Sequence, residues 1–195
     1  MTLVLGLDCA VSGLGVALVH DGTCLASLRE EGRDQAARLL PAVASVLRDS
    51  GQSRSDVSLI AVTVGPGSFT GVRVGLAAAR GLAVGLGVPL AGLVTTSVLH
   101  MQAVTRSRLI VAAIDSRLGD WFCSIGEEAA PFAATATGLA EAFSWSRLSG
   151  FSLRAGFVPQ RQACQTANRP ASGRPEATVG PVVARFGRAC VFESW

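Results

Sequence analysis

Short apolar runs at the start of the chain are separated by turn residues, and this pattern predicts strands in succession, the first of them buried. The strands are expected at residues 2–8, 15–20 and 23–29, with a turn at 9–14 between the first two. Asp21-Gly22 separates the second strand from the third and is typical of a two-residue hairpin turn. The chain is therefore expected to open with three antiparallel strands.

Apolar residues recur at helical spacing between residues 34 and 50, and Gly51 supplies a stop signal. Pro41 interrupts the predicted helix about two turns from its start. Proline lacks the amide hydrogen and its ring clashes with the preceding turn, so either a kink at Pro41 or a helix that begins near it is expected. The positions with helical spacing are Ala36, Leu39, Leu40, Val43, Val46 and Leu47.

A glycine-rich loop follows the next predicted strand, at 58–64, and leads into a helix. Glycine accepts positive φ and proline fixes its own φ, so this loop is a shaped turn. Its amides could hold an anion such as phosphate at the start of the helix, or the loop could be a tight corner that binds nothing. Ser68 and Thr70 are predicted to cap the helix, and Phe69 is either a plug into the core or an exposed anchor. The residues of this motif loop are Gly65, Pro66, Gly67, Ser68, Phe69, Thr70 and Gly71, followed by Arg73.

The helix predicted at 72–86 is apolar nearly all round, and only Arg73 and Arg80 are polar. A helix covered on one face would show a polar stripe. The two alternatives are a fully internal helix and a helix that presents one face to a partner, and the small number of elements available to cover it favours the partner-binding face. The small residues along the helix would let another helix approach closely.

A strand at 89–95 and a helix at 97–105 complete the order β-β-β-α-β-α-β-α, which predicts a mixed sheet with helices on its faces. This α/β order resembles the half-domain of the actin, Hsp70 and sugar-kinase type of ATPase fold. A strand at 109–114, a turn at 115–120 and a strand at 121–125 begin a second round, so we expect half-domains at 1–106 and 107–195, each with a mixed sheet.

The second half-domain is expected to be shortened or altered and irregular beyond about residue 158. A short helix at 138–143 and a strand at 151–158 are expected, followed by a loop-like stretch at 159–181. Residues 182–195 are left open between a last helix and strand and an unstructured tail.

Composition indicates a globular protein, because 49% of the 195 residues are hydrophobic and 16% are charged. Arg73 and Arg80 interrupt the most apolar region and the N-terminus lacks a basic secretory start, so no membrane span and a cytoplasmic location are expected. The five cysteines contain no Cys-x-x-Cys pair and the two histidines fit no metal-binding helix pattern. Neither a disulfide framework nor a metal site is predicted.

Charge is uneven along the chain, whose formal net charge is +3. After residue 145, seven arginines face two glutamates, a local excess of +5. Such a basic tail could contact the phosphates of a nucleic acid, but no aromatic interleaving accompanies it, and a solvated surface is favoured.

The run Gly65-Pro66-Gly67-Ser68-Phe69-Thr70-Gly71-Val72-Arg73-Val74-Gly75 resembles the hallmark of the TsaB (YeaZ) family. This family is related to TsaD and to the glycoprotease-like (peptidase M22-type) superfamily. Segments 5–8, 38–41 and 113–120 support the resemblance, which covers residues 1 to about 126 in order.

The resemblance implies a noncatalytic subunit that binds and activates TsaD while threonylcarbamoyl is transferred to N6 of adenosine 37, in tRNAs that read codons starting with A. TsaD would be bound through the two helices of the first half-domain, a TsaE-type ATPase would join, and ATP and a metal ion would be used by the partners. The chain itself would bind no cofactor and would meet tRNA through the complex. The interface residues implied on the two helices are Leu39, Val43, Val72, Gly75, Leu76, Ala79, Arg80, Leu82 and Ala83.

Asp8 and Asp115 stand where the ATPase fold places its phosphate-binding hairpins. An ATPase of this fold carries Asp-x-Gly-Thr there, whereas no glycine directly follows Asp8, so both aspartates are interpreted as vestigial positions that bond backbone amides. This favours the tight corner over the phosphate cradle for the motif loop. Ser68 is outside any Gly-x-Ser-x-Gly elbow, and no catalytic residue is predicted. The alternatives are an active ATPase or peptidase of the same fold, or a homodimeric binding module.

Overall fold

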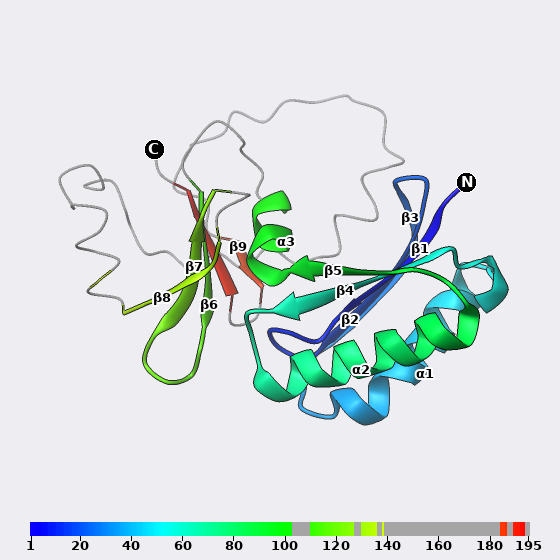
Figure 1. The fold of residues 1–195 in the computed structure, drawn as a ribbon, viewed down its shortest axis with the longest axis horizontal. Helices are drawn as coiled ribbons and strands as arrows, with labels where there is room; N and C mark the ends of the chain where they lie inside the picture. The colour runs from blue at the N-terminus through cyan, green and yellow to red at the C-terminus, as the bar shows by residue number, and fades with distance from the viewer. Residues whose placement is uncertain (103–109, 127–129, 136–137, 139–183, 187–188, 194–195) are drawn as a thin grey trace, which may run out of the picture.

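The computed structural model describes the chain except for residues 103–109, 127–129, 136–137, 139–183, 187–188 and 194–195 (Figure 1). A five-stranded sheet in the order β3-β2-β1-β4-β5 forms the first half. β1 pairs antiparallel with β2, as does β2 with β3, whereas β4 runs parallel to both β1 and β5. The three predicted antiparallel strands and the mixed sheet are confirmed. The strands are β1 (Leu3–Asp8), β2 (Leu14–His20), β3 (Thr23–Glu30), β4 (Leu59–Gly65) and β5 (Leu90–Val94).

Two helices, α1 (Gln35–Asp49) and α2 (Phe69–Leu86), cover one face of this sheet, and the short α3 (Thr95–Met101) lies on the other face (Figure 1). Alternation along β1 explains the layering, because Leu3, Leu5 and Leu7 are all at most 3% exposed and belong to the core under α1 and α2. A single turn of 3₁₀ helix, η1 (Arg54–Asp56), precedes β4.

α1 runs through Pro41 without a break, so the alternative of a helix that begins near Pro41 is wrong. Leu39, Val43 and Val46 face the core, whereas Pro41 and Ala37 are exposed. The bond lost at a proline is the one to the carbonyl four residues earlier, which here belongs to Ala37. Since Ala37 is exposed, water can bond that carbonyl and the helix continues.

α2 begins at Phe69 rather than at 72, because Ser68 is its N-cap and accepts a hydrogen bond from the Gly71 amide at 3.3 Å. Gly87 ends the helix in the left-handed conformation, with φ of 66°. α3 likewise begins earlier than predicted, at Thr95, and ends at Met101.

The second half contains a sheet in the order β8-β7-β6-β10-β9 in which every described pair is antiparallel, whereas a mixed sheet was predicted for this half as well. Residues 184–193, left open by the sequence, hold two strands, and β10 lies beside the central β6. The strand predicted at 151–158 and all but one residue of the helix predicted at 138–143 lie outside the described residues. The strands are β6 (Ile110–Asp115), β7 (Trp121–Ile125), β8 (Phe132–Ala134), β9 (Ala184–Phe186) and β10 (Ala189–Glu193).

An apolar cluster joins the two halves. Ala10 and Val11 from the β1–β2 loop and Leu99 of α3 pack with Ala112 and Ile114 of β6, and Val72 of α2 and Phe122 of β7 border the cluster. Beside it, the buried His100 ring of α3 bonds through Nε2 to the hydroxyl of Ser124 on β7, at 2.9 Å. The halves are therefore held together by both apolar packing and a buried polar pair.

Candidate functional site

The motif loop is held against the β1–β2 loop by its backbone. The amide of Ser68 donates to the carbonyl of Ala10 at 2.6 Å, and the amide of Gly71 donates to the Ser68 hydroxyl. Two amides that an anion would need are therefore already bonded within the chain, which favours the tight corner over the phosphate cradle.

Two glycines of the motif are required by close approach rather than by backbone angle. A Cβ at Gly67 would lie 2.1 Å from the Ala10 carbonyl oxygen, and a Cβ at Gly71 would lie 2.0 Å from the Cys9 carbonyl oxygen. Gly65 needs its positive φ of 103°. The motif therefore seals the corner between β4 and α2 onto the end of β1.

Thr70, predicted as a second cap, is instead the second residue of α2 and is exposed. A residue with helical backbone angles cannot serve as the N-cap, which has non-helical angles, and Ser68 occupies that position. The prediction for Ser68 is confirmed and that for Thr70 is wrong.

The two aspartates bond backbone amides, as expected for vestigial positions. Asp8 accepts through Oδ1 from the amide of Ala10 at 2.9 Å and from the hydroxyl of Thr63 at 2.7 Å. Asp115 accepts through Oδ1 from the amide of Arg117 at 2.8 Å. Each aspartate ends a strand and bonds the amide two residues on, so both halves begin their first hairpin with the same local turn.

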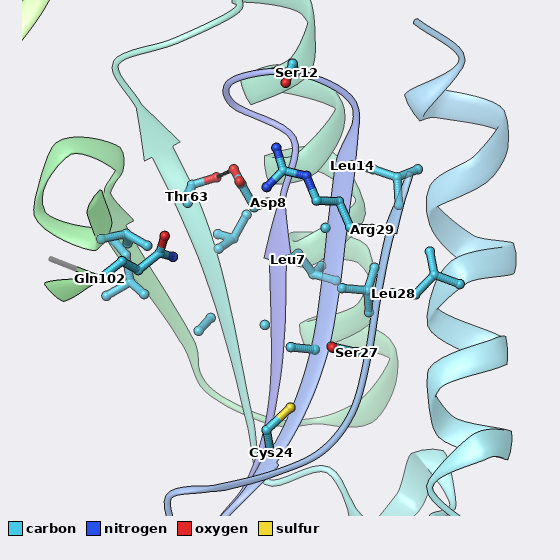
Figure 2. A pocket seen from close by; sticks show the side chains of 18 residues that line it. Leu7, Asp8, Ser12, Leu14, Cys24, Ser27, Leu28, Arg29, Thr63 and Gln102 are labelled. Atoms are coloured by element: carbon cyan, nitrogen blue, oxygen red, sulfur yellow. Dashed lines mark hydrogen bonds between the residues drawn. The ribbon is translucent and has the colours of Figure 1, made fainter. Parts of the chain in front are cut away.

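A cavity of about 360 Å³ lies on the face of the first sheet opposite α1 and α2. Figure 2 shows Asp8 bonded to Thr63 near its upper end, with the Arg29 side chain reaching toward them from β3, while Cys24 lies at its lower end. Small residues contributed by the strands, Gly6, Gly15, Ala17 and Ala61, are among those lining the cavity.

The two buried thiols of Cys9 and Cys123 are poorly suited to act as nucleophiles. Burial, with a smaller contribution from the charge of Asp8, raises the pKa of Cys9 to about 12, and burial raises the pKa of Cys123 to about 11. Both thiols stay protonated near neutral pH, and the thiolate is the reactive form. Among the described residues, no group of three His, Cys, Asp or Glu side chains could hold a metal ion.

The outward stripe of α2 consists of five residues at helical spacing that lie opposite its buried face. Phe69 is 70% exposed and Val84 is 85% exposed, so Phe69 is an exposed residue and not a plug into the core. The guanidinium of Arg73 lies 3.4 Å from the centroid of the Phe69 ring. On α1, Leu40 is exposed as well, at 53%. The stripe comprises Phe69, Arg73, Ala77, Arg80 and Val84, all exposed.

Most of the interface residues proposed from the sequence lie on the inward side instead. Of the nine, only Arg80 belongs to the outward stripe. Val72 borders the cluster between the halves, and Leu76 and Leu82 pack against the core from partly buried positions. The residues that are buried against the sheet are Leu39, Val43, Gly75, Ala79 and Ala83.

These α2 residues face inward because small residues at every fourth position let the helix approach its own sheet closely. A Cβ at Gly75 would already lie 3.4 Å from the Cβ of Cys9 on the sheet side. Arg73 and Arg80 marked the solvent-facing side of α2 in the sequence, since charged side-chain ends stay in water. By length and mean hydropathy, 1.3 over 18 residues, α2 could also cross a membrane, but one or two such helices are weak evidence, and its buried residues pack on the sheet.

Comparisons with known proteins identify relatives of this chain. The family model described as "TsaD: tRNA N6-adenosine threonylcarbamoyltransferase" matches residues 29–144, which is more than half of the 195 residues. The chain is 39% identical over 119 residues to the tRNA threonylcarbamoyladenosine biosynthesis protein TsaB of Escherichia coli (strain K12), a match covering 60% of this chain and 52% of that protein. It is 32% identical over 123 residues to the TsaB protein of Bacillus subtilis (strain 168), covering 63% of this chain and 54% of that protein.

Among solved structures, YeaZ from Pseudomonas aeruginosa superposes with a TM-score of 0.59 at 34% identity, covering 70% of this chain and 66% of that chain. The chain spans about half the length of the curated relatives it matches. The expected fold class is confirmed by this superposition and by the mixed first sheet with its helices. On these matches, and with the motif loop and the strand order described above, the chain belongs to the TsaB (YeaZ) family of TsaD-related proteins.

Proposed function

We propose that the chain is a noncatalytic subunit that binds and activates a TsaD-type subunit in formation of threonylcarbamoyladenosine at position 37 of tRNA. Its relatives carry the name of tRNA threonylcarbamoyladenosine biosynthesis proteins. The proposal includes a cytoplasmic location, a TsaE-type ATPase that joins the complex, tRNA that is met through the complex, and ATP and a metal ion used by the partners.

The observation that carries the proposal is the outward surface of α1 and α2. Phe69, Val84 and Leu40 expose between 53% and 85% of their area to solvent, on two helices that lie side by side over one face of the sheet (Figure 1). Apolar surface flanked by charged residues is typical of a protein interaction site. Fully burying each of these side chains against a partner would contribute about 1.5–3 kcal/mol before the costs of association.

The rest of the site supports a binding role over a catalytic one. The Asp8 carboxylate bonds an amide and a hydroxyl of the chain itself, and the motif loop closes on the Cys9–Ala10 backbone. These groups stabilise the turn between β4 and α2, and the outward stripe of α2 begins at Phe69, directly after that turn.

Calorimetric titration of the chain with a purified TsaD-type subunit tests the proposal. Unchanged chain is expected to form a heterodimer, and Val84→Glu is expected to abolish it, because a charge would enter an apolar interface. Val84 is 85% exposed, so the substitution leaves the core intact. The matched control is Leu25→Glu on β3, a residue 38% exposed that belongs to a strand at the edge of the sheet.

Full affinity in the Val84→Glu variant would remove the interface assignment. ATP turnover by the isolated chain would favour the enzyme alternative, and light scattering that shows a dimer of the chain alone would favour the homodimeric module.

A further inference from the structure

The β6–β7 turn, residues 115–120, presents an apolar side chain on a firmly bonded base. Leu118 at its tip is 89% exposed. The Leu118 amide donates to the Ser116 hydroxyl oxygen at 3.0 Å, and the Ser116 hydroxyl in turn donates to the Asp120 carboxylate. The Ser116 amide bonds the Asp120 carbonyl at 3.2 Å. The tip is therefore preorganised, which lowers the entropy lost when a partner covers it.

Arg117 beside it has a left-handed backbone, with φ of 67°, a conformation that is uncommon for residues other than glycine, asparagine and aspartate. Its amide is held by the Asp115 carboxylate at 2.8 Å. The result is an exposed cationic side chain next to an exposed apolar one. The same combination occurs at the start of α2, where Arg73 lies over Phe69.

The turn lies close to the start of α2. Ile114, directly before the turn, belongs to the apolar cluster between the halves, and Phe122 after the turn and Val72 of α2 both pack against that cluster. In Figure 1 the turn projects from the end of β6 and β7 toward the lower side of the view, where α2 also begins. The base of the turn and the start of α2, where the outward stripe begins, therefore meet at the same apolar cluster between the two halves.

We propose that the β6–β7 turn is a second docking element for the TsaD-type partner, beside the start of α2 and its outward stripe. The inference rests on the proposed function. Leu118 enters an apolar pocket of the partner, and carboxylates at the edge of that pocket pair with Arg117 and Arg73. The second half thus adds a contact away from α1 and α2, and this second contact helps to fix the orientation of the partner.

The experiment is calorimetric titration of the full chain and its variants with the TsaD-type subunit at two salt concentrations. Leu118→Ser removes the apolar contact and is expected to weaken binding about tenfold. Arg117→Asn removes the charge while keeping a residue that tolerates a left-handed backbone, and it is expected to weaken binding about fivefold at low salt and to flatten the salt dependence. The matched controls are Leu25→Ser and Arg33→Asn, both at exposed positions outside the turn and the stripe.

The outcomes separate the two proposals. Normal affinity and salt dependence in both turn variants, together with loss of binding in Val84→Glu, would overturn the docking role of the turn and leave the proposed function standing. Failure of the unchanged chain to bind the subunit would overturn both. Weakening in the turn variants that exceeds the controls, with unchanged circular dichroism and melting temperature, supports the second docking element.

Discussion

Replacing Gly71 by alanine should destabilise the protein even though alanine is the better helix former. Gly71 is the third residue of α2, and the added Cβ would lie 2.0 Å from the Cys9 carbonyl oxygen. Real Cβ atoms essentially never come within 3.0 Å of such an atom, so the start of α2 must move away from β1 by roughly 1 Å. Overpacking of this kind costs about 1–3 kcal/mol.

The displacement also strains two hydrogen bonds at the corner. The Ser68 cap on the Gly71 amide and the bond from the Ser68 amide to Ala10 contribute about 1 kcal/mol each. Better helix propensity returns about 1 kcal/mol. The expected net loss in the free energy of unfolding is about 2–4 kcal/mol.

Urea unfolding followed by circular dichroism measures this loss, and Gly81→Ala is the matched control. Gly81 is in the same helix, is exposed, and has nothing within 4 Å of an added Cβ, so the same substitution there should stabilise by about 0.5–1 kcal/mol. If both variants shift the unfolding midpoint alike, the close packing of the motif on the β1–β2 loop is refuted.

Two further predictions concern buried groups. The pKa is about 12 for Cys9 and about 11 for Cys123 in the folded protein, whereas both thiols ionise near pH 9 in the unfolded chain. Since ionisation between these values favours the unfolded state, the free energy of unfolding should fall as the pH rises from about 9 to 12. A flat stability profile over this range would contradict this prediction. At pH 8 the half-buried Cys24 should alkylate before either of these thiols, as mass spectrometry of the native protein would show. Replacing His100 by leucine or Ser124 by alanine leaves a buried polar partner and should cost about 1–3 kcal/mol each, whereas the double variant should cost less than their sum, and strict additivity in thermal unfolding would show that the pair is not coupled.

Local patterns predicted the elements of the first half well because their signals lie within a few residues. The apolar runs before residue 30 and the Asp21-Gly22 turn yielded β1, β2 and β3 with their ends nearly correct. α2 begins three residues earlier than predicted because Ser68 is its N-cap. α1 continues through Pro41 because the residue whose carbonyl loses its hydrogen bond, Ala37, is exposed. The prediction that Asp8 and Asp115 bond backbone amides is confirmed.

The candidate site was predicted only in part. The two helices and the motif loop were identified, but five of the nine interface residues are buried against the sheet of the same chain. In a helix that is apolar nearly all round, no periodic contrast shows which side faces the sheet, and small residues suit close packing against either a sheet or a partner. The positions of Arg73 and Arg80 did indicate which side of α2 faces solvent.

The amino-acid sequence by itself determined the strand and helix order of the first half and the family, because each depends on backbone preferences and local spacing. The need for glycine at 67 and 71 was decided by the tertiary structure, since an added Cβ there would meet the backbone of Ala10 or Cys9. Only the tertiary structure decided that α2 turns Gly71, Gly75, Ala79 and Ala83 inward and Phe69 and Val84 outward. It also decided that β10 pairs with β6, residues more than 70 positions apart in the chain. Such choices depend on which surfaces are buried together when distant segments meet, and no local pattern contains that information.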